Sequence, residues 1–338
     1  MTAEALPETM RALCLTDYGG GPHALRLVRR PVPKPAPGQL LVRVKAAPIH
    51  PADQMFMRGQ YGVKKPLPVV PGFEGSGTVV AAGSLAGRLL VGRRVGVSSA
   101  QSQDGTWAEY VVVPMSQCLP LLPGIDDEQG ASLFVNPFSA WAMMELARQG
   151  KHRALVQSAA ASTLGRMLLR LSLQAGIPLV NIVRRAEQEE LLRGLGAEHV
   201  VNSSEPEFEE RLRLRCHELG VTLGFDAVAG AMTGQLLQAL PEGGTVVVYG
   251  ALSGEESRVP VGELIFRRQK VEGFWLGTWL SQGFGKSQLR ALVEVPLRMG
   301  KAFETPVRAC FPLEAAEEAL RLAGTDMTSG KVFFTPNA

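Results

Sequence analysis

The stretch ALVQSAAASTLGRMLLRLSLQAGIPLVNIVRR, residues 154–185, decides the fold of this chain. A short apolar run comes first, and the helical pattern that follows it ends at Gly176. Glycine is the usual residue just past the C-terminus of a helix. A second apolar run then extends from Pro178 to Val183. A strand, a helix and a strand of these lengths predict a βαβ unit, and therefore a parallel sheet.

The alternation of strands and helices continues to about residue 280. Further examples are the strand patterns GFDAV (224–228) and GGTVVVYG (243–250) and the helical patterns AEQEELLRGLG (186–196) and AMTGQLLQAL (231–240). Such a series predicts an α/β fold of the Rossmann type, with a doubly wound parallel sheet.

The first part of the chain follows a different pattern. Short β-like runs such as QLLVRVKAAPI (39–49) are separated by turns such as KPAPG (34–38). This pattern favours a mostly antiparallel, partly open β-barrel. A helix, LEAAEEALRLAG (313–324), and a strand, GKVFFTP (330–336), are expected near the end. A chain of 338 residues is long for one hydrophobic core, so we expect two domains, residues 1–125 with 281–338 and residues 126–280.

Composition excludes several classes of protein. Hydrophobic residues make up 46% and charged residues 20%, as in ordinary globular enzymes, and the net charge of +3 gives no support for a nucleic-acid partner. No apolar stretch has the length of about 20 residues that spans a membrane. The N-terminal residues show no secretory or transit pattern. The scattered cysteines predict neither disulfides nor a structural zinc site, so we expect a cytoplasmic protein. They are Cys14, Cys118, Cys216 and Cys310.

The turn SAAASTLGR (158–166) is the candidate nucleotide site. At such a turn, backbone N–H groups of a helix N-terminus and the helix dipole bind a pyrophosphate. Gly165 alone remains of the usual glycine pattern, but the small neighbouring residues allow close approach, and the hydroxyls of Ser162 and Thr163 can donate to phosphate oxygens. The alternative interpretation is an N-capped helix after a buried strand, without a ligand.

Two arginines follow the second strand of this unit. An acid at this place binds the ribose 2′-hydroxyl of NAD, whereas an arginine suits the 2′-phosphate of NADP. Arg184 and Arg185 come directly after Val183, and a guanidinium can hold a phosphate with two parallel hydrogen bonds. The sequence therefore predicts NADP(H) as the cofactor. The alternative is a solvated basic turn.

Several longer segments resemble the zinc-independent medium-chain dehydrogenase/reductases, over nearly the whole chain. Within that family the sequence is most similar to the trans-2-enoyl-thioester reductases, and the zeta-crystallin-like quinone oxidoreductases are the next group. The segments are IHPADQMFMRGQYGVKKPLPVVPGFEGSG (49–77), NPFSAWAMM (136–144), LVNIVRR (179–185), YGALSG (249–254), FRRQKVEGFWLGTWL (266–280) and SGKVFFTP (329–336). The resemblance implies a GroES-like barrel domain beside the Rossmann domain, and a homodimer.

The resemblance also argues against a metal. Zinc-dependent members have a histidine where this chain has Phe73, and they carry a four-cysteine lobe that is absent here. The five histidines lack the spacing of a ligand set, so we expect no metal.

The resemblance implies site residues one by one. Tyr61 matches a tyrosine that donates a proton or orients the substrate. Thr163 stands where a glycine is usual in the pyrophosphate turn. The residues that match cofactor contacts are Asn136, Ser162, Thr163, Leu164, Gly165, Arg184, Arg185, Tyr249, Gly250, Ala251, Leu252, Phe274, Trp275, Leu276, Gly277 and Lys331.

Other residues near these segments allow two interpretations each. His50 and Asp53 belong to the active site, or Asp53 caps a loop whose path Pro51 fixes. Trp275 and Trp279 line an acyl pocket, or they provide aromatic packing. The run FRRQK (266–270) meets a phosphate of CoA, or it is a solvated loop, which is the commoner meaning.

These expectations lead to a function with alternatives. In reduction of a 2-enoyl thioester, hydride reaches the β carbon while negative charge builds on the thioester oxygen, and a tyrosine hydroxyl at Tyr61 can donate there. The acyl group is carried by CoA or by acyl carrier protein. One alternative is an NADPH quinone or alkenal reductase. Another is a non-catalytic NADP(H)-binding protein that serves in interactions.

Overall fold

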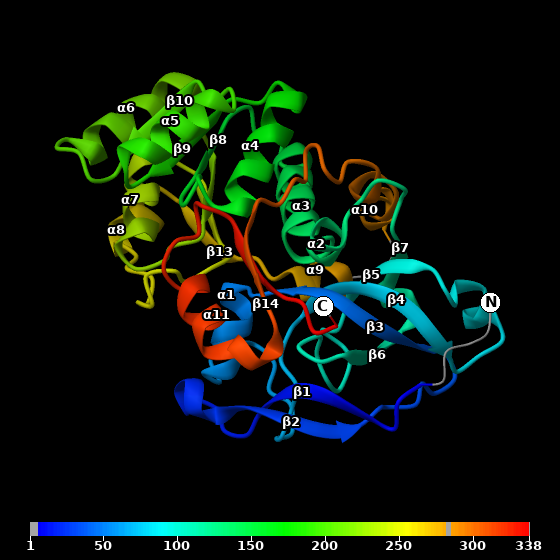
Figure 1. Ribbon diagram of the computed structural model, residues 1–338. Helices are drawn as coiled ribbons and strands as arrows, with labels where there is room; N and C mark the ends of the chain where they lie inside the picture. The colour runs from blue at the N-terminus through cyan, green and yellow to red at the C-terminus, as the bar shows by residue number, and fades with distance from the viewer. Residues whose placement is uncertain (1–5, 282–284, 338) are drawn as a thin grey trace. The chain divides into compact units, whose positions relative to one another are not determined.

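The computed structural model describes residues 6–281 and 285–337, and the chain divides into two compact units. Unit 1 comprises Met1–Val135 and Val295–Ala338, and unit 2 comprises Asn136–Glu294 (Figure 1). The sequence predicted the same two-part arrangement, with boundaries after residues 125 and 280. The structure places both boundaries later in the chain.

Side-chain contacts explain both differences. Helix α2 (Asp127–Ala131) belongs to unit 1, because Ser76 Oγ donates to the Asp127 carbonyl at 2.6 Å and Arg94 pairs with the Asp127 carboxylate at 2.7 Å. Most of helix α10 (Lys286–Leu297) belongs to unit 2, because Ser287 Oγ donates to Glu145 Oε2 at 2.9 Å. Neither contact has a signal in the sequence.

Unit 2 contains a six-stranded parallel sheet, as predicted. Its strands are β8 (Leu155–Gln157), β9 (Leu179–Val183), β10 (His199–Asn202), β11 (Leu223–Asp226), β12 (Thr245–Val248) and β13 (Lys270–Gly273). The order across the sheet is β10-β9-β8-β11-β12-β13, and every pair is parallel. The order changes direction between β8 and β11, which makes the carboxyl ends of these two strands the expected place for a ligand.

Successive strands of this sheet are connected by helices (Figure 1). The connecting helices are α4 (Thr163–Ala175), α5 (Ala186–Gly194), α6 (Phe208–Leu219), α7 (Ala231–Ala239) and α8 (Val261–Phe266). Helix α3 (Val135–Gln149) precedes β8, and α9 (Leu276–Ser281) and α10 follow β13. Strands β8, β9 and β11 are buried throughout, as expected for parallel strands with both faces covered. Helix α4 ends at Gly176 with φ 64°, the left-handed conformation that glycine adopts freely.

Unit 1 contains a seven-stranded sheet and a separate hairpin. The sheet order is β14-β15-β3-β4-β5-β7, and β6 also pairs with β3. The strands are β14 (Val307–Phe311), β15 (Lys331–Phe334), β3 (Gln39–Pro48), β4 (Glu74–Ala82), β5 (Arg94–Ser98), β7 (Cys118–Pro120) and β6 (Tyr110–Pro114). Apart from the parallel pair β14–β15, neighbouring strands are antiparallel, which confirms the predicted barrel-like, GroES-type domain.

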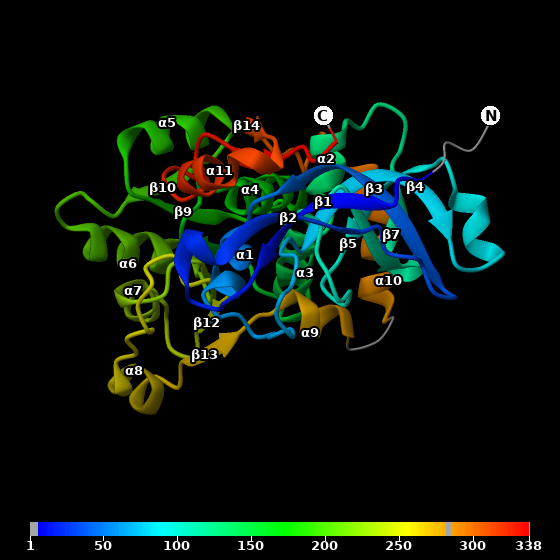
Figure 2. The same ribbon diagram turned by 60° about the horizontal axis from the view of Figure 1, so that its bottom comes forward.

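The hairpin of β1 (Thr9–Leu15) and β2 (Leu25–Pro31) lies outside the seven-stranded sheet (Figure 2). The short helices of unit 1 are η1 (Gly21–Ala24), α1 (Pro51–Met57), η2 (Ala86–Leu90), η3 (Met115–Gln117), η4 (Leu313–Ala315) and α11 (Ala316–Ala323), besides α2.

The end of the chain is built into the core of unit 1. The ring of Phe334 on β15 meets the fully buried Trp107 edge to face, with ring centroids 5.1 Å apart. The indole N–H of Trp107 donates to the Pro48 carbonyl at 3.3 Å. These contacts explain why the last strand completes the first unit. None of the helices that the structure describes is both long and apolar enough to cross a membrane.

Candidate active site

Tyr61 packs against aromatic side chains of unit 1. Its ring packs against Phe73, with ring centroids 4.8 Å apart and the planes tilted by 37°. Phe56 on α1 meets the same ring of Phe73 edge to face at 5.6 Å. Tyr61 itself is half-buried, so its ring is held while part of it stays accessible.

The buried side chain of Asp53 fixes the backbone next to these aromatic rings. Asp53 accepts the backbone N–H of His50 at 2.8 Å on one oxygen and that of Phe73 at 3.0 Å on the other. The contact with His50 closes the first turn of α1, which Pro51 opens, so Asp53 has the contacts of the capping interpretation. Burial raises the pKa of Asp53 to about 7.

Three further ionisable groups of unit 1 form a chain of hydrogen bonds, although they come from distant parts of the sequence. Glu74 Oε1 lies 2.5 Å from His50 Nε2, and His50 Nδ1 lies 2.8 Å from Lys331 Nζ. The second oxygen of Glu74 accepts the backbone N–H groups of Phe134 at 2.8 Å and Val135 at 2.9 Å. Each of the three side chains is at least nine-tenths buried.

Hydrogen-bonding capacity fixes the order of the protons in this chain. A lysine ammonium can only donate, so Lys331 requires a lone pair on His50 Nδ1. The imidazole then carries its proton on Nε2 and donates it to the Glu74 carboxylate. Burial, and next the charge of Lys331, lower the pKa of His50, which keeps the ring neutral at pH 7. Burial also lowers the pKa of Lys331 to about 8, against the opposite effects of Glu74 and Asp53.

The predicted pyrophosphate turn lies at the start of α4 in unit 2. Ser162 is the N-cap and accepts the Gly165 N–H at 3.1 Å, which leaves its own hydroxyl hydrogen available. A Cβ on Gly165 would lie 2.4 Å from the Ala160 carbonyl oxygen, so only glycine fits there. Thr163 and Leu164 are buried in the first turn of the helix. The helix forms there although Thr163 stands where a glycine is usual.

A hydrogen-bond network beside this turn was missed from the sequence. Ser158 Oγ, after β8, donates to Asp226 Oδ1 at 2.8 Å and accepts the Ala227 N–H at 2.8 Å. It thus joins the carboxyl ends of β8 and β11 where the strand order reverses. The residues that follow on each side, Ala159 with φ 48° and Ala229 with φ 62°, are in the left-handed conformation. Single serine and aspartate residues carry no sequence signal for such a link.

The loop after β12 packs onto the same edge. The Tyr249 N–H donates to the Asp226 carbonyl at 2.9 Å, and a Cβ on Gly250 would lie 2.7 Å from the Ala227 carbonyl oxygen. The hydroxyl of Tyr249 is buried and has no hydrogen-bond partner among the described residues. Burial, and next the charge of Asp226, raise the pKa of Tyr249. Ala251 and Leu252 continue the loop and are exposed.

Arg184 and Arg185 lie at the end of β9, and both are exposed. Arg185 is the N-cap residue of α5. Ser204 Oγ donates to the Arg184 carbonyl at 2.7 Å and fixes the turn. Within residues 6–281 and 285–337, the guanidinium of Arg184 has no hydrogen bond or ion pair, so this charge is available to a ligand.

The last predicted cofactor segment follows β13. The Phe274 N–H donates to the Val248 carbonyl at 2.9 Å, and Trp275 is 42% exposed just before α9, which begins at Leu276 and Gly277. Apart from Asn136, the predicted residues of unit 2 therefore follow β8, β9, β12 and β13, at the carboxyl ends of the parallel strands. Asn136 is buried in the first turn of α3.

Two family models match the chain. The alcohol dehydrogenase GroES-like domain matches residues 36–123, and the zinc-binding dehydrogenase family matches residues 163–294. Among curated proteins, the mitochondrial enoyl-[acyl-carrier-protein] reductase of Arabidopsis thaliana is 32% identical over 86% of this chain and 78% of that protein. The chain belongs to the medium-chain dehydrogenase/reductase family. Within it, the chain stands in the zinc-independent group of enoyl reductases and quinone oxidoreductases, as the sequence predicted.

Solved structures of the family agree with this assignment. A provisionally assigned NADPH:quinone reductase from Mesorhizobium loti is 34% identical and has a TM-score of 0.90, with 98% of this chain and 100% of that chain covered. The quinone oxidoreductase from Thermus thermophilus, solved also with NADPH, is 29% identical with a TM-score of 0.77, over 96% of this chain and 100% of that chain. Unit 1 is thus the GroES-like domain of the family and unit 2 its Rossmann domain.

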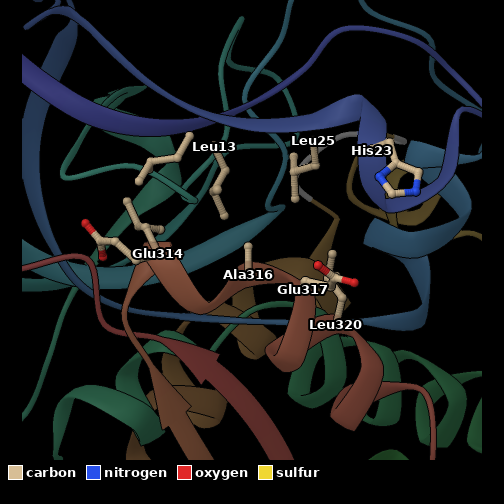
Figure 3. A pocket seen from close by; sticks show the side chains of 9 residues that line it. Leu13, His23, Leu25, Glu314, Ala316, Glu317 and Leu320 are labelled. Atoms are coloured by element: carbon tan, nitrogen blue, oxygen red, sulfur yellow. The ribbon is translucent and has the colours of Figure 1, made fainter.

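Two features of this family member lie apart from the predicted site residues. A cavity of about 320 Å³ lies between the β1–β2 hairpin and the η4–α11 segment (Figure 3). Its lining includes Leu13, Leu25, Glu317 and Leu320, and none of the predicted site residues. Among the residues described, no group of three or more His, Cys, Asp or Glu side chains is placed to hold a metal ion.

The basic run at residues 266–270 has partners within unit 2. Arg267 pairs with Glu263 at 2.7 Å, and Arg268 pairs with Glu242 at 2.5 Å. These ion pairs favour the interpretation of residues 266–270 as a loop. They argue against the alternative, a site for a phosphate of CoA. Trp279 is buried in α9, which fits packing, whereas Trp275 is more accessible.

Proposed function

We propose that this protein reduces the α,β double bond of a 2-enoyl thioester with NADPH. It is an NADP(H)-dependent oxidoreductase of the medium-chain family, and its relatives include enzymes that act on C=C bonds and on quinones. The observation that carries the thioester proposal is the position of Tyr61. Its ring packs against that of Phe73, whose backbone N–H is bound by Asp53. The enoyl-[acyl-carrier-protein] reductase names of curated relatives support the same substrate class.

The Rossmann domain fits NADP(H). The cofactor supplies hydride to the acceptor when it is bound. The Gly165 turn, together with the Ser162 hydroxyl, leaves room and donors for the pyrophosphate, and the exposed Arg184 offers a charge for the 2′-phosphate. The buried hydroxyl of Tyr249 is a polar group that a bound cofactor can satisfy. We propose that Asn136, Arg185, Ala251, Leu252 and residues 274–277 complete this cofactor site.

Tyr61 can then act on the acceptor. When hydride reaches the β carbon, the electron pair of the double bond moves toward the thioester oxygen, and a proton must later reach the α carbon. A tyrosine hydroxyl keeps its proton at neutral pH and can donate it, or it can hold the carbonyl in place. The acyl chain is carried by CoA or by acyl carrier protein, both of which present the same thioester.

The test is NADPH oxidation with crotonyl-CoA, trans-2-octenoyl-CoA and 1,4-benzoquinone in parallel, with NADH as the cofactor control. We expect turnover of the enoyl thioesters and a preference for NADPH. Turnover of the quinone alone would instead support the second candidate, a quinone reductase. That candidate is favoured by the similarity to the Mesorhizobium loti structure, at a TM-score of 0.90.

Replacement of Tyr61 by Phe tests the role of its hydroxyl. The ring contact with Phe73 is kept, so we expect kcat for the enoyl thioester to fall by about 10²-fold or more, the usual size of general acid catalysis. Tyr18→Phe is the matched control in unit 1, because the Tyr18 hydroxyl is already bound to the backbone of Lys65. Unchanged kcat in Tyr61→Phe would exclude the proton-donor role.

We also propose a homodimer joined at the edge of the parallel sheet. Strand β13 has a strand neighbour on one side only among the described residues, and the preceding helix α8 exposes Ile265 at 61% and Phe266 at 81%. Light scattering after gel filtration should give the mass of two chains, and Phe266→Glu should give one. Leu89→Glu, an equally exposed apolar residue in unit 1, should leave the mass unchanged.

A cytoplasmic location stays a prediction from the sequence.

A further inference from the structure

The ammonium group of Lys331 has unused hydrogen-bonding capacity. An ammonium carries three N–H donors, and in unit 1 one of them is directed at His50 Nδ1, 2.8 Å away. No other acceptor among the described residues bonds to Lys331 Nζ. Lys331 is 8% exposed, so its side chain is nearly enclosed but not sealed. A buried ammonium with free donors is ready to bind an oxygen that carries negative charge.

The remaining members of the chain hold this ammonium in place. The Glu74 carboxylate, itself fixed by the Phe134 and Val135 N–H groups, keeps the imidazole proton on Nε2. The lone pair of His50 Nδ1 is therefore directed at the charged form of Lys331. A carboxylate that sets the tautomer of a histidine, which in turn orients a third group, is an arrangement that enzymes use for positioning.

The reaction needs a positive charge next to the oxygen of the acceptor. Hydride addition to the β carbon moves the electron pair of the double bond onto the carbonyl oxygen, which becomes an enolate oxygen. In zinc-dependent members of the family a ligand histidine stands at the position of Phe73, the residue that directly precedes Glu74 and binds Asp53 through its N–H. In this chain Glu74, the next residue, is linked through His50 to the ammonium of Lys331.

We propose that Lys331 is a further catalytic residue, which donates a hydrogen bond to the acceptor oxygen as that oxygen becomes negative, and that His50 and Glu74 are its positioning residues. No proton needs to leave Lys331 in this step, because the α carbon receives its proton afterwards. The proposal rests on the proposed function for the identity of the oxygen. It holds equally for a quinone, whose oxygen gains the same charge on hydride transfer.

The pH dependence follows from the groups around Lys331, which are His50, Asp53 and Glu74. Burial lowers the pKa of Lys331 to about 8, while Glu74 and Asp53 favour its charged form. The charged form is the one that stabilises an oxyanion, so the activity that depends on Lys331 is lost as the pH rises through about 8. An arginine at this position stays charged in that range.

The experiment compares Lys331→Met, Lys331→Arg and His50→Gln with the unchanged protein. Each is assayed for kcat and KM across pH, with the enoyl thioester and with benzoquinone, and for NADPH affinity by fluorescence and for melting temperature. Loss of an oxyanion donor typically costs about 10²- to 10³-fold in kcat, which we expect for Lys331→Met at an NADPH affinity within about threefold of the original. Lys331→Arg should keep more activity and lose the decline above about pH 8. His50→Gln should lower kcat by about tenfold, because the charge remains but its position is not fixed.

Lys65→Met is the matched control. Lys65 is another partly buried lysine of unit 1, but its ammonium is bound to the carbonyls of Ser99 and Ser102. Its replacement should lower the melting temperature and leave the decline with pH in place. The proposal is overturned if Lys331→Met weakens NADPH binding tenfold or more while kcat at saturating NADPH is kept, which is the cofactor role that the family resemblance implies. It is also overturned if Lys331→Arg shows the original pH profile.

The two proposals fail separately. If the protein reduces benzoquinone but no enoyl thioester, the proposed function is wrong, and the role of Lys331 is measured with the quinone. If the thioester is reduced and Lys331→Met is as active as the original, the function stands and the role of Lys331 is wrong.

Discussion

The pyrophosphate turn of unit 2 and the cluster of Glu74, His50 and Lys331 in unit 1 both contain buried polar groups, yet they are assembled differently. In the turn, the contacts join residues within a few positions, such as Ser162 with Gly165. In the cluster, Lys331 meets a histidine 281 positions away, and Glu74 binds the N–H of Phe134, 60 positions away. A local site leaves a motif in the sequence, whereas a site assembled from distant strands does not.

The two regions also stabilise charge by different means. The turn offers backbone N–H groups and a helix dipole, which have no pKa and stay the same at any pH. The cluster relies on ionisable side chains whose pKa values are moved by burial. Binding of the cofactor at the turn should therefore vary little with pH, and the behaviour of unit 1 should vary strongly.

Replacement of Gly165 by Val should abolish NADPH binding. The added side chain would meet the Ala160 carbonyl at 2.4 Å from its Cβ, and the turn must then open. Titration of NADPH by fluorescence should show no saturation, while circular dichroism reports whether the fold is kept. Gly194→Ala is the control, because a Cβ there meets nothing within 4 Å and the position is helical. Normal binding in Gly165→Val would show that the turn is not the cofactor site.

The double replacement Arg184→Ala and Arg185→Ala should weaken NADPH binding by about 10- to 100-fold, the size of a lost charge-assisted hydrogen bond of about 1.5–3 kcal/mol. NADH binding should change little, because NADH lacks the 2′-phosphate. Competition experiments with both cofactors measure the ratio. Arg193→Ala, on the same helix but paired with Glu189 at 2.7 Å, should leave it unchanged. An equal loss for NADH would assign the arginines a structural role.

The parts of the molecule that the sequence predicts are those in which neighbours along the chain decide the structure. Helix α4 is capped by Ser162 and Gly176 for local reasons, and the arginines follow β9 directly. The family resemblance added Tyr61, which no spacing pattern indicates. The link between Ser158 and Asp226 could not be predicted, because it depends on which strands become neighbours in the sheet. The partnership of His50 with Lys331 was missed for the same reason.

Replacement of Asp53 by Asn should leave cofactor binding unchanged and alter how the stability of the fold depends on pH. Burial raises the pKa of Asp53 to about 7 from its ordinary 3.8, so the folded protein holds a proton that the unfolded chain releases. This contribution to stability is complete below pH 3.8 and is lost as the pH rises through about 7. One pKa unit corresponds to about 1.4 kcal/mol, so the change amounts to a few kcal/mol.

Melting temperatures across this pH range measure the effect. The unchanged protein should melt at lower temperature as the pH rises from about 4 to 7, and Asp53→Asn should show a flatter profile. The amide cannot accept both the His50 and the Phe73 N–H groups in the same way, so the variant should be less stable at acid pH. A steep profile that persists in the variant would assign the pH dependence to other groups.

The edge strand β13 has a consequence for the handling of this protein. Among the described residues β13 has a strand neighbour on one side only, and such an edge becomes a template for strands of other chains when dilution separates the proposed dimer. Lys270 and Glu272, both exposed on this short strand, oppose such growth, because an incoming strand must bring opposite charges into register. A substitution that removes both charges should leave the folded chain intact and shorten its lifetime in concentrated solution.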